Sequence, residues 1–129
     1  MKATMKLTEL EASVLGRMLA DNELSPRRGE LHAEAVVVVG REFTGAGFLT
    51  ELQRSPGLKL FDDGVSMRWG EVGARLNATK IETGFLVYVD NGYVTAIEGY
   101  TYGDEWPAKV EQVEFYKLTS GTELENPPR

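Results

Sequence analysis

The first hydrophobic pattern along the chain has the period of an α-helix. Over residues 8–21, apolar side chains recur at spacings of three and four, at Leu10, Val14, Leu15, Met18 and Leu19. Thr8-Glu9-Leu10-Glu11 matches a capping box, in which the Thr8 hydroxyl and the Glu11 carboxylate each accept a hydrogen bond from a free backbone amide. Ser25-Pro26 then disfavours helical backbone. The pattern predicts an amphipathic helix over residues 8–21 whose apolar stripe packs on a sheet.

From His32 onward the period falls to two, and short β-prone runs are separated by glycines. Such runs are typical of an antiparallel sheet. The run Ala35-Val36-Val37-Val38-Val39 is apolar at consecutive positions, which predicts a central strand that is covered on both sides over at least part of its length and extends towards Phe43. A glycine-rich turn over residues 44–47 leads to a strand over residues 48–52, and a second turn over residues 62–64 precedes a strand over residues 65–69.

The clearest local signal is a hairpin over residues 85–98, because Asn91-Gly92 accepts the positive φ angles of a type I′ turn. A two-residue loop predicts three facing pairs of apolar side chains. These pairs are Val89 with Val94, Val87 with Ala96, and Leu86 with Ile97.

The last element, Val110 to Leu118, reads as a strand in preference to a short helix that starts at Pro107, because Val113-Glu114-Phe115-Tyr116 is β-rich. The predicted fold class is α+β: an N-terminal amphipathic helix packed on a mostly antiparallel β-sheet with short strands. We expect a single domain over residues 1–120 and a flexible C-terminal tail over residues 121–129.

Composition restricts the location of the protein. The chain of 129 residues contains no cysteine, which excludes disulfides and thiolate metal sites and is compatible with a reducing compartment. The N-terminal residues carry no signal-peptide pattern, and the longest apolar run, residues 35–39, is far shorter than the roughly 20 residues that span a bilayer. These features predict a cytoplasmic protein that does not bind membranes.

Charge bears on the class of partner. The net charge is −6, and residues 98–125 contain seven acids and two bases. An acidic chain is a poor nucleic-acid binder, because phosphate contacts require clustered lysine and arginine. The acidic stretch is either a solvated face that aids solubility or a surface for a basic protein partner.

The familiar catalytic and cofactor patterns are missing from the sequence. His32 is the single histidine, so one chain cannot assemble a Ser-His-Asp triad or a multi-histidine metal site. Gly45-Ala46-Gly47 lacks the third glycine and the following helix of a dinucleotide-binding loop, and no Walker-type motif occurs. We therefore predict no enzyme activity, no cofactor and no metal, although the carboxylates of Asp104 and Glu105 could hold a hard cation weakly together with Glu98.

An aromatic cluster lies within the acidic stretch. Tyr100, Tyr102 and Trp106 stand beside Asp104 and Glu105. Aromatic rings flanked by charges are typical of protein interfaces, so these five residues are the predicted binding surface. The alternative interpretation is that Tyr100 and Trp106 close the edge of the core.

Two segments carry a resemblance to a group of proteins. Arg41-Glu42-Phe43-Thr44-Gly45-Ala46-Gly47-Phe48 contains a Phe-Thr-Gly-x-Gly-Phe turn, and Glu98-Gly99-Tyr100-Thr101-Tyr102-Gly103-Asp104-Glu105-Trp106-Pro107 contains Glu-Gly-Tyr-x-Tyr-Gly-Asp-x-Trp-Pro. With these motifs the chain resembles a group of small uncharacterised bacterial proteins over about half its length. The resemblance implies a bacterial intracellular protein and carries over no catalytic residue.

Two hypotheses for function follow from the sequence. The first is a non-enzymatic binding or interaction protein that uses the acidic and aromatic surface, with an immunity-like role against a basic toxin as one concrete form. The second is a small-ligand-binding protein or minor enzyme with a pocket between helix and sheet, in which Arg41, Arg75 or Glu98 would be polar anchors. The short strands also leave a sheet edge that a second copy of the chain could cover as a homodimer.

Overall fold

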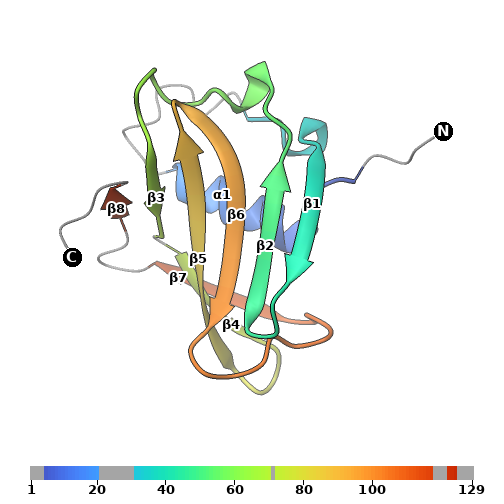
Figure 1. Cartoon of the computed structure of the whole chain (residues 1–129). Helices are drawn as coiled ribbons and strands as arrows, with labels where there is room; N and C mark the ends of the chain where they lie inside the picture. Colours follow the sequence, from blue (N-terminus) through green and yellow to red (C-terminus); the bar gives the residue numbers. More distant parts are fainter. Residues whose placement is uncertain (1–4, 21–30, 71, 118–121, 125–129) are drawn as a thin grey trace.

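One α-helix lies across one face of an antiparallel sheet in the computed structural model, which describes residues 5–20, 31–70, 72–117 and 122–124 (Figure 1). The described elements are α1 (Glu9–Ala20), the 3₁₀ helices η2 (Ala33–Ala35) and η3 (Pro56–Leu58), and the strands β1 (Val38–Phe43), β2 (Gly47–Leu52), β3 (Met67–Trp69), β4 (Val72–Leu76), β5 (Ile81–Asp90), β6 (Tyr93–Thr101), β7 (Val113–Lys117) and β8 (Thr122–Leu124). The predicted α+β class is confirmed.

Helix α1 begins where the capping box predicts. The Thr8 N–H donates to a Glu11 carboxylate oxygen at 2.9 Å, and the Glu11 N–H donates to the Thr8 hydroxyl at 3.1 Å. The predicted stripe faces the sheet, with Leu10 half-buried and the other four side chains buried. The predicted helix end at residue 21 lies outside the described residues.

The strands pair in the order β1-β2-β6-β5-β3-β8, and every pair in the described sheet is antiparallel. The long strand β5 pairs over one part of its length with β3 and over the other with β4, which pairs in turn with β7. Strand β7 crosses β5 and β6 at a steep angle in Figure 1. This crossing is consistent with the strong twist of an antiparallel sheet.

The predicted β5–β6 hairpin is confirmed, but its register is not. Asn91 and Gly92 have φ angles of 48° and 87°, as a type I′ turn requires. Val89 faces Val94 as predicted, and then a bulge at Thr95 shifts the pairing by one residue. Val87 therefore faces Ile97 instead of Ala96, and Leu86 faces Glu98 instead of Ile97. The bulge allows Val94 and Ile97, three positions apart, to enter the core together.

Strand β1 corrects a second prediction, because it is not central. It pairs with β2 at one end of the described sheet and otherwise touches Met5 through a single bridge. Burial alternates along the valine run, so that Val38 is 3% exposed and Val39 is 58% exposed. A continuous apolar run is compatible with a buried strand, but here one side of the edge strand faces outward.

After Pro107, the described residues form two strands, β7 and β8, and no helix. Strand β7 confirms the preferred interpretation of the segment that begins at Val110, and Leu118 lies outside the described residues. Within the predicted flexible tail, Thr122–Leu124 form β8 and pair with β3. The other residues of the predicted tail lie outside the described residues.

The core lies between α1 and the sheet. Its largest fully buried side chains include Trp69, Phe61 and Phe85, each 0% exposed, and the buried residues of α1 pack in the same cluster. Within the described residues, no helix has the length and apolar character to cross a membrane.

Candidate functional site

The two sequence motifs that are more than fifty residues apart lie against each other in the structure. The Thr101 N–H donates to the Ala46 carbonyl at 2.8 Å, and the Trp106 N–H donates to the Gly45 carbonyl at 2.7 Å. The loop after β6 is thus hydrogen-bonded to the β1–β2 turn. The Trp106 ring packs edge-on against Phe48, with 5.2 Å between ring centroids.

Glycines make this contact close. A Cβ at Gly47 would lie 1.9 Å from the Gly99 carbonyl oxygen, and a Cβ at Gly99 would lie 2.4 Å from the Phe48 ring. Neither position has room for a side chain. Packing therefore explains the glycines at these two positions. Gly47 allows β2 and β6 to approach each other, and Gly99 leaves room for the Phe48 ring.

The five residues predicted as one binding surface lie on two sides of the sheet. Trp106 is half-buried and also packs edge-on against Phe85 in the core, with 6.3 Å between centroids. Tyr100 follows Gly99, whose core side is covered by Phe48, so its side chain lies on the opposite face of the sheet. Tyr102 contacts Tyr100 there, with 5.5 Å between ring centroids.

Asp104 and Glu105 stand in the loop that follows β6. Both side chains are exposed, and neither carboxylate has an ion-pair partner within the described part of the chain. The Thr101 hydroxyl donates to the Asp104 backbone carbonyl, which holds the start of the loop against the end of β6. The two acids therefore project from a tethered loop.

Tyrosine side chains cover two glycines on the face of the described sheet that is turned away from α1. Tyr100 and Tyr102 lie over Gly84, where an added Cβ would be 2.6 Å and 2.7 Å from their hydroxyl oxygens, and Tyr116 lies over Gly73, where it would be 2.6 Å from the ring. Gly73 and Gly84 face each other across β4 and β5. We call the group Tyr88, Tyr100, Tyr102, Tyr116, Glu82 and Glu98 the tyrosine face.

Hydrogen bonds to carboxylates orient the rings of Tyr116 and Tyr88. The Tyr116 hydroxyl donates to Glu82, whose other oxygen accepts a hydrogen bond from the Arg75 guanidinium at 2.7 Å. The Tyr88 hydroxyl donates to Glu98 in the same way. The rings of Tyr88 and Tyr116 are therefore fixed at both ends, by the strand that carries each ring and by a carboxylate on another strand.

The environment of the tyrosine face changes the acidity of its phenols. Burial raises the pKa of Tyr100 to about 12, aided by the hydrogen bond with Tyr102 and the negative charge of Glu98. Burial and the hydrogen bond to Glu82 raise the pKa of Tyr116 to about 12. The same hydrogen bond from Tyr116, with the guanidinium of Arg75, lowers the pKa of Glu82. The neutral phenol and the ionised acid thus stabilise each other.

We predict that Tyr100 and Tyr116 ionise near pH 12, well above the usual value of about 10 for tyrosine. Because their pKa values are raised on folding, their contribution to stability is complete below pH ~10 and is lost as the pH rises through about 12. Absorbance titration at 295 nm, together with urea unfolding between pH 9 and pH 12, measures both effects.

The variants Tyr100→Phe and Tyr116→Phe are the controls for this titration. Each should remove one phenol from the high-pH step and weaken the alkaline loss of stability. If both variants left the titration above pH 11 unchanged, the assignment of these two phenols would be wrong.

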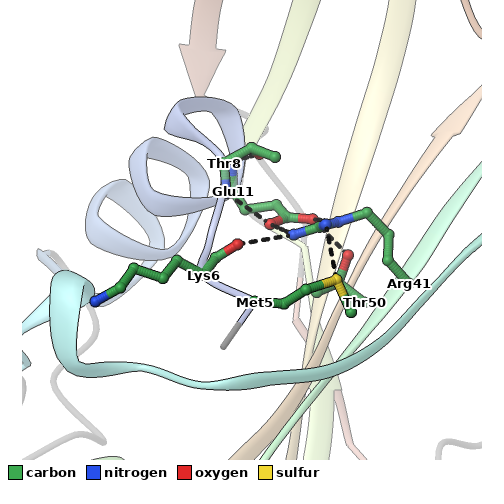
Figure 2. A network of polar contacts seen from close by, with 6 residues as sticks. All are labelled: Met5, Lys6, Thr8, Glu11, Arg41 and Thr50. Carbon is green, nitrogen blue, oxygen red and sulfur yellow. Dashed lines mark hydrogen bonds and ion pairs between the residues drawn. The ribbon is translucent and has the colours of Figure 1, made fainter. Parts of the chain in front are cut away.

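On the other side of the sheet, Glu11 and Arg41 form a buried ion pair that links α1 to β1 (Figure 2). The Arg41 Nε donates to one Glu11 oxygen at 2.8 Å and Nη2 donates to the other at 2.7 Å, so the pair is bidentate. The Thr50 hydroxyl also donates to Glu11, and Arg41 Nη2 donates to the Lys6 carbonyl at 3.1 Å. The Glu11 side chain is 2% exposed and that of Arg41 is 16% exposed.

Opposing effects act on the Glu11 carboxyl. Burial would raise its pKa, but the hydrogen bonds from Arg41, Thr50 and the Thr8 amide outweigh burial and lower the pKa. The sequence predicts the capping role of Glu11, but its burial was not predicted. The signal was present, because Glu11, Val14, Leu15 and Met18 share the spacing of the apolar stripe.

A pocket of about 550 Å³ opens beside this ion pair, between the start of α1, the β1–β2 turn and the segment over residues 106–115. Aromatic rings from four elements or loops line it: Phe43, Phe48, Trp106 and Phe115. Of the three polar anchors predicted for a pocket between helix and sheet, Arg41 lines it. Glu98 instead belongs to the tyrosine face, and Arg75 contacts that face through Glu82.

Two further candidate groups were weighed from the sequence. His32 is exposed and precedes η2, without a capping hydrogen bond from its side chain. In the described ranges, no three acidic or histidine side chains converge as a metal site would require. Gly45, with a φ angle of 86°, lies in the β1–β2 turn as predicted.

Comparison of the chain with protein-family models, with curated proteins and with solved structures gives no significant match. Function is therefore inferred from the chemistry of the tyrosine face and of the pocket.

Proposed function

We propose that this chain is a non-enzymatic interaction protein of the bacterial cytoplasm that binds a basic protein through the tyrosine face and the adjoining acids Asp104 and Glu105. An immunity-like role against a basic toxin is the concrete form of this proposal. The proposed location in the bacterial cytoplasm rests on the resemblance at the two motifs and on the cysteine-free composition.

One observation carries the proposal: the tyrosine rings are held in place before any partner arrives. Tyr100 lies over a glycine against Tyr102, and the hydroxyls of Tyr88 and Tyr116 are hydrogen-bonded to Glu98 and Glu82. Tyrosines that are already ordered lose little side-chain entropy on binding, which favours affinity. Such rings dominate the energetics of many interfaces.

Charge indicates the kind of partner. Asp104 and Glu105 are exposed in the loop that follows Tyr102, without ion-pair partners among the described residues. Lysine and arginine side chains of a partner would pair with these carboxylates and could also stack on the exposed ring of Tyr102. The Tyr116 ring already has the Arg75 guanidinium 4.7 Å from its centroid. The net charge of −6 acts in the same direction by steering a basic protein towards the chain.

The test compares capture of proteins from the native cell by the wild type, by Tyr102→Ser and by the double variant Asp104→Lys/Glu105→Lys. Tyr102 is 59% exposed, so its replacement should leave the fold intact. The matched control is Glu34→Lys, a charge reversal at an exposed residue of η2. We expect the wild type and the control to retain a basic protein that the other two variants lose.

The captured protein is then purified and titrated against each variant. Loss of the Tyr102 ring should weaken binding at least tenfold, within the range of interface hot spots, and raised salt should slow association. The proposal fails if the captured proteins are the same for all four chains, or if the partner is acidic and its association does not depend on salt.

A further inference from the structure

We propose that the pocket between α1, the β1–β2 turn and residues 106–115 is a binding site for a small organic cation with an aromatic or apolar body. The site lies on the opposite side of the sheet from the tyrosine face, so the inference does not depend on the proposed interaction. Its volume of about 550 Å³ is within the usual range of small-molecule sites.

The apolar part of the ligand follows from the rings that line the pocket. Phe48, Trp106 and Phe115 are partly or fully covered by the core, whereas Phe43 is 67% exposed at the end of β1. Val113, at the start of β7, also lines the pocket and is 37% exposed. A flat apolar molecule bound between these side chains would shield the exposed surfaces of Phe43 and Val113 from water.

The charge of the ligand follows from the acids and bases around the rings. Among the described residues, Arg41 is the one cationic side chain of the lining, and both oxygens of Glu11 already neutralise it. The Arg17 guanidinium lies 4.4 Å from the centroid of the Phe115 ring, so this ring already has a cation over it. Two further carboxylates line the pocket, those of Glu9 and Glu111. The Glu9 carboxylate has no ion-pair partner among the described residues, and Glu111 has a single contact at 4.0 Å, with the exposed Lys109.

A positive charge in the pocket therefore meets two carboxylates and the rings of Phe43, Phe48 and Trp106, whereas the described residues of the lining offer an anion no unpaired base. A cation over an aromatic ring is stabilised by the electrons of the ring face. Together these groups favour an amine or quaternary ammonium over a neutral molecule of equal shape. A carboxylate of the same shape should bind worst.

Three probes of similar shape test this order of affinities: 1-naphthylmethylammonium, 1-naphthylmethanol and 1-naphthoate. Isothermal titration calorimetry measures the affinity of each probe, because the naphthalene ring absorbs and emits in the same range as tryptophan and rules out tryptophan fluorescence. We expect the ammonium to bind about three- to tenfold more tightly than the alcohol and the carboxylate to bind more weakly still. Ligand-detected NMR provides a second, independent measurement of binding.

Two variants locate the site. Glu9→Gln should reduce the preference for the ammonium over the alcohol, while Phe43→Ser should weaken both probes to a similar extent. Both residues are exposed, and thermal unfolding of each variant checks the fold. The proposal is overturned if the ammonium shows no saturable binding at millimolar concentration, if the carboxylate binds as well as the ammonium, or if neither substitution alters binding.

Discussion

Replacement of Arg41 by alanine is expected to lower the free energy of unfolding by about 3–5 kcal/mol, because it leaves the Glu11 carboxylate buried without its cation. The pair joins α1 to β1, so its loss also loosens the contact between the helix and the edge of the sheet. Urea unfolding at pH 7, followed by far-UV circular dichroism, measures the difference.

Two controls separate this effect from ordinary loss of charge. Arg54 pairs with Asp90, but both side chains are about half exposed or more, and Arg54→Ala should cost less than about 1 kcal/mol. The double variant Glu11→Met/Arg41→Met removes both charges and should recover at least half of the loss. A loss below 1 kcal/mol for Arg41→Ala would show that the pair is not buried as described.

The Arg41→Ala effect should also depend on pH. In the wild type the pKa of Glu11 is lowered, so its contribution to stability is present above the unfolded value of about 4.3 and is lost as the pH falls through the folded value. In the variant, burial without the cation should raise the same pKa, and protonation should then relieve the buried charge. The difference between the two proteins is therefore expected to shrink between pH 7 and pH 4.

Gly47→Ala is expected to lower the free energy of unfolding by about 3 kcal/mol, at the upper end of the range for overpacked sites. The added methyl would lie 1.9 Å from the Gly99 carbonyl oxygen, a backbone atom that cannot rotate away. β2 and β6 must separate at the point where the two sequence motifs meet. Thermal and urea unfolding measure the loss.

Gly40→Ala is the matched control for Gly47→Ala. Gly40 lies in β1, next to β2, and its nearest neighbour for an added Cβ is the flexible end of Glu51 at 3.9 Å. This variant should change stability by less than about 1 kcal/mol. Equal effects for the two substitutions would mean that β2 and β6 are not as close as the structure has them.

Local signals in the sequence predicted the helix and the hairpin correctly. The capping box and the Asn-Gly turn each act within four residues, and both have the expected geometry. The bulge at Thr95 carries no such signal, because it arises from the need to place Val94 and Ile97 in one core. The position of β1 at the edge depends on long-range pairing with β2, which an apolar run cannot indicate.

The five residues of the predicted binding surface do not all lie on one side of the sheet. Tyr100 and Tyr102 share a face, while Trp106 turns to the core through the hydrogen bond of its amide to Gly45. Tyr88 and Tyr116 were missed, because they come from other strands and reach the same face only through the sheet register. Burial of Glu11 could have been found, since it occupies the centre of the apolar stripe.

The most direct test of the tyrosine face as the contact surface is the affinity of a purified basic partner for Tyr102→Ser and for Trp106→Phe, measured beside the wild type. These residues are four apart in one motif but point to opposite sides of the sheet. We expect Tyr102→Ser to weaken binding at least tenfold and Trp106→Phe to leave it unchanged. The reverse pattern, with the partner lost by Trp106→Phe and kept by Tyr102→Ser, would contradict this assignment.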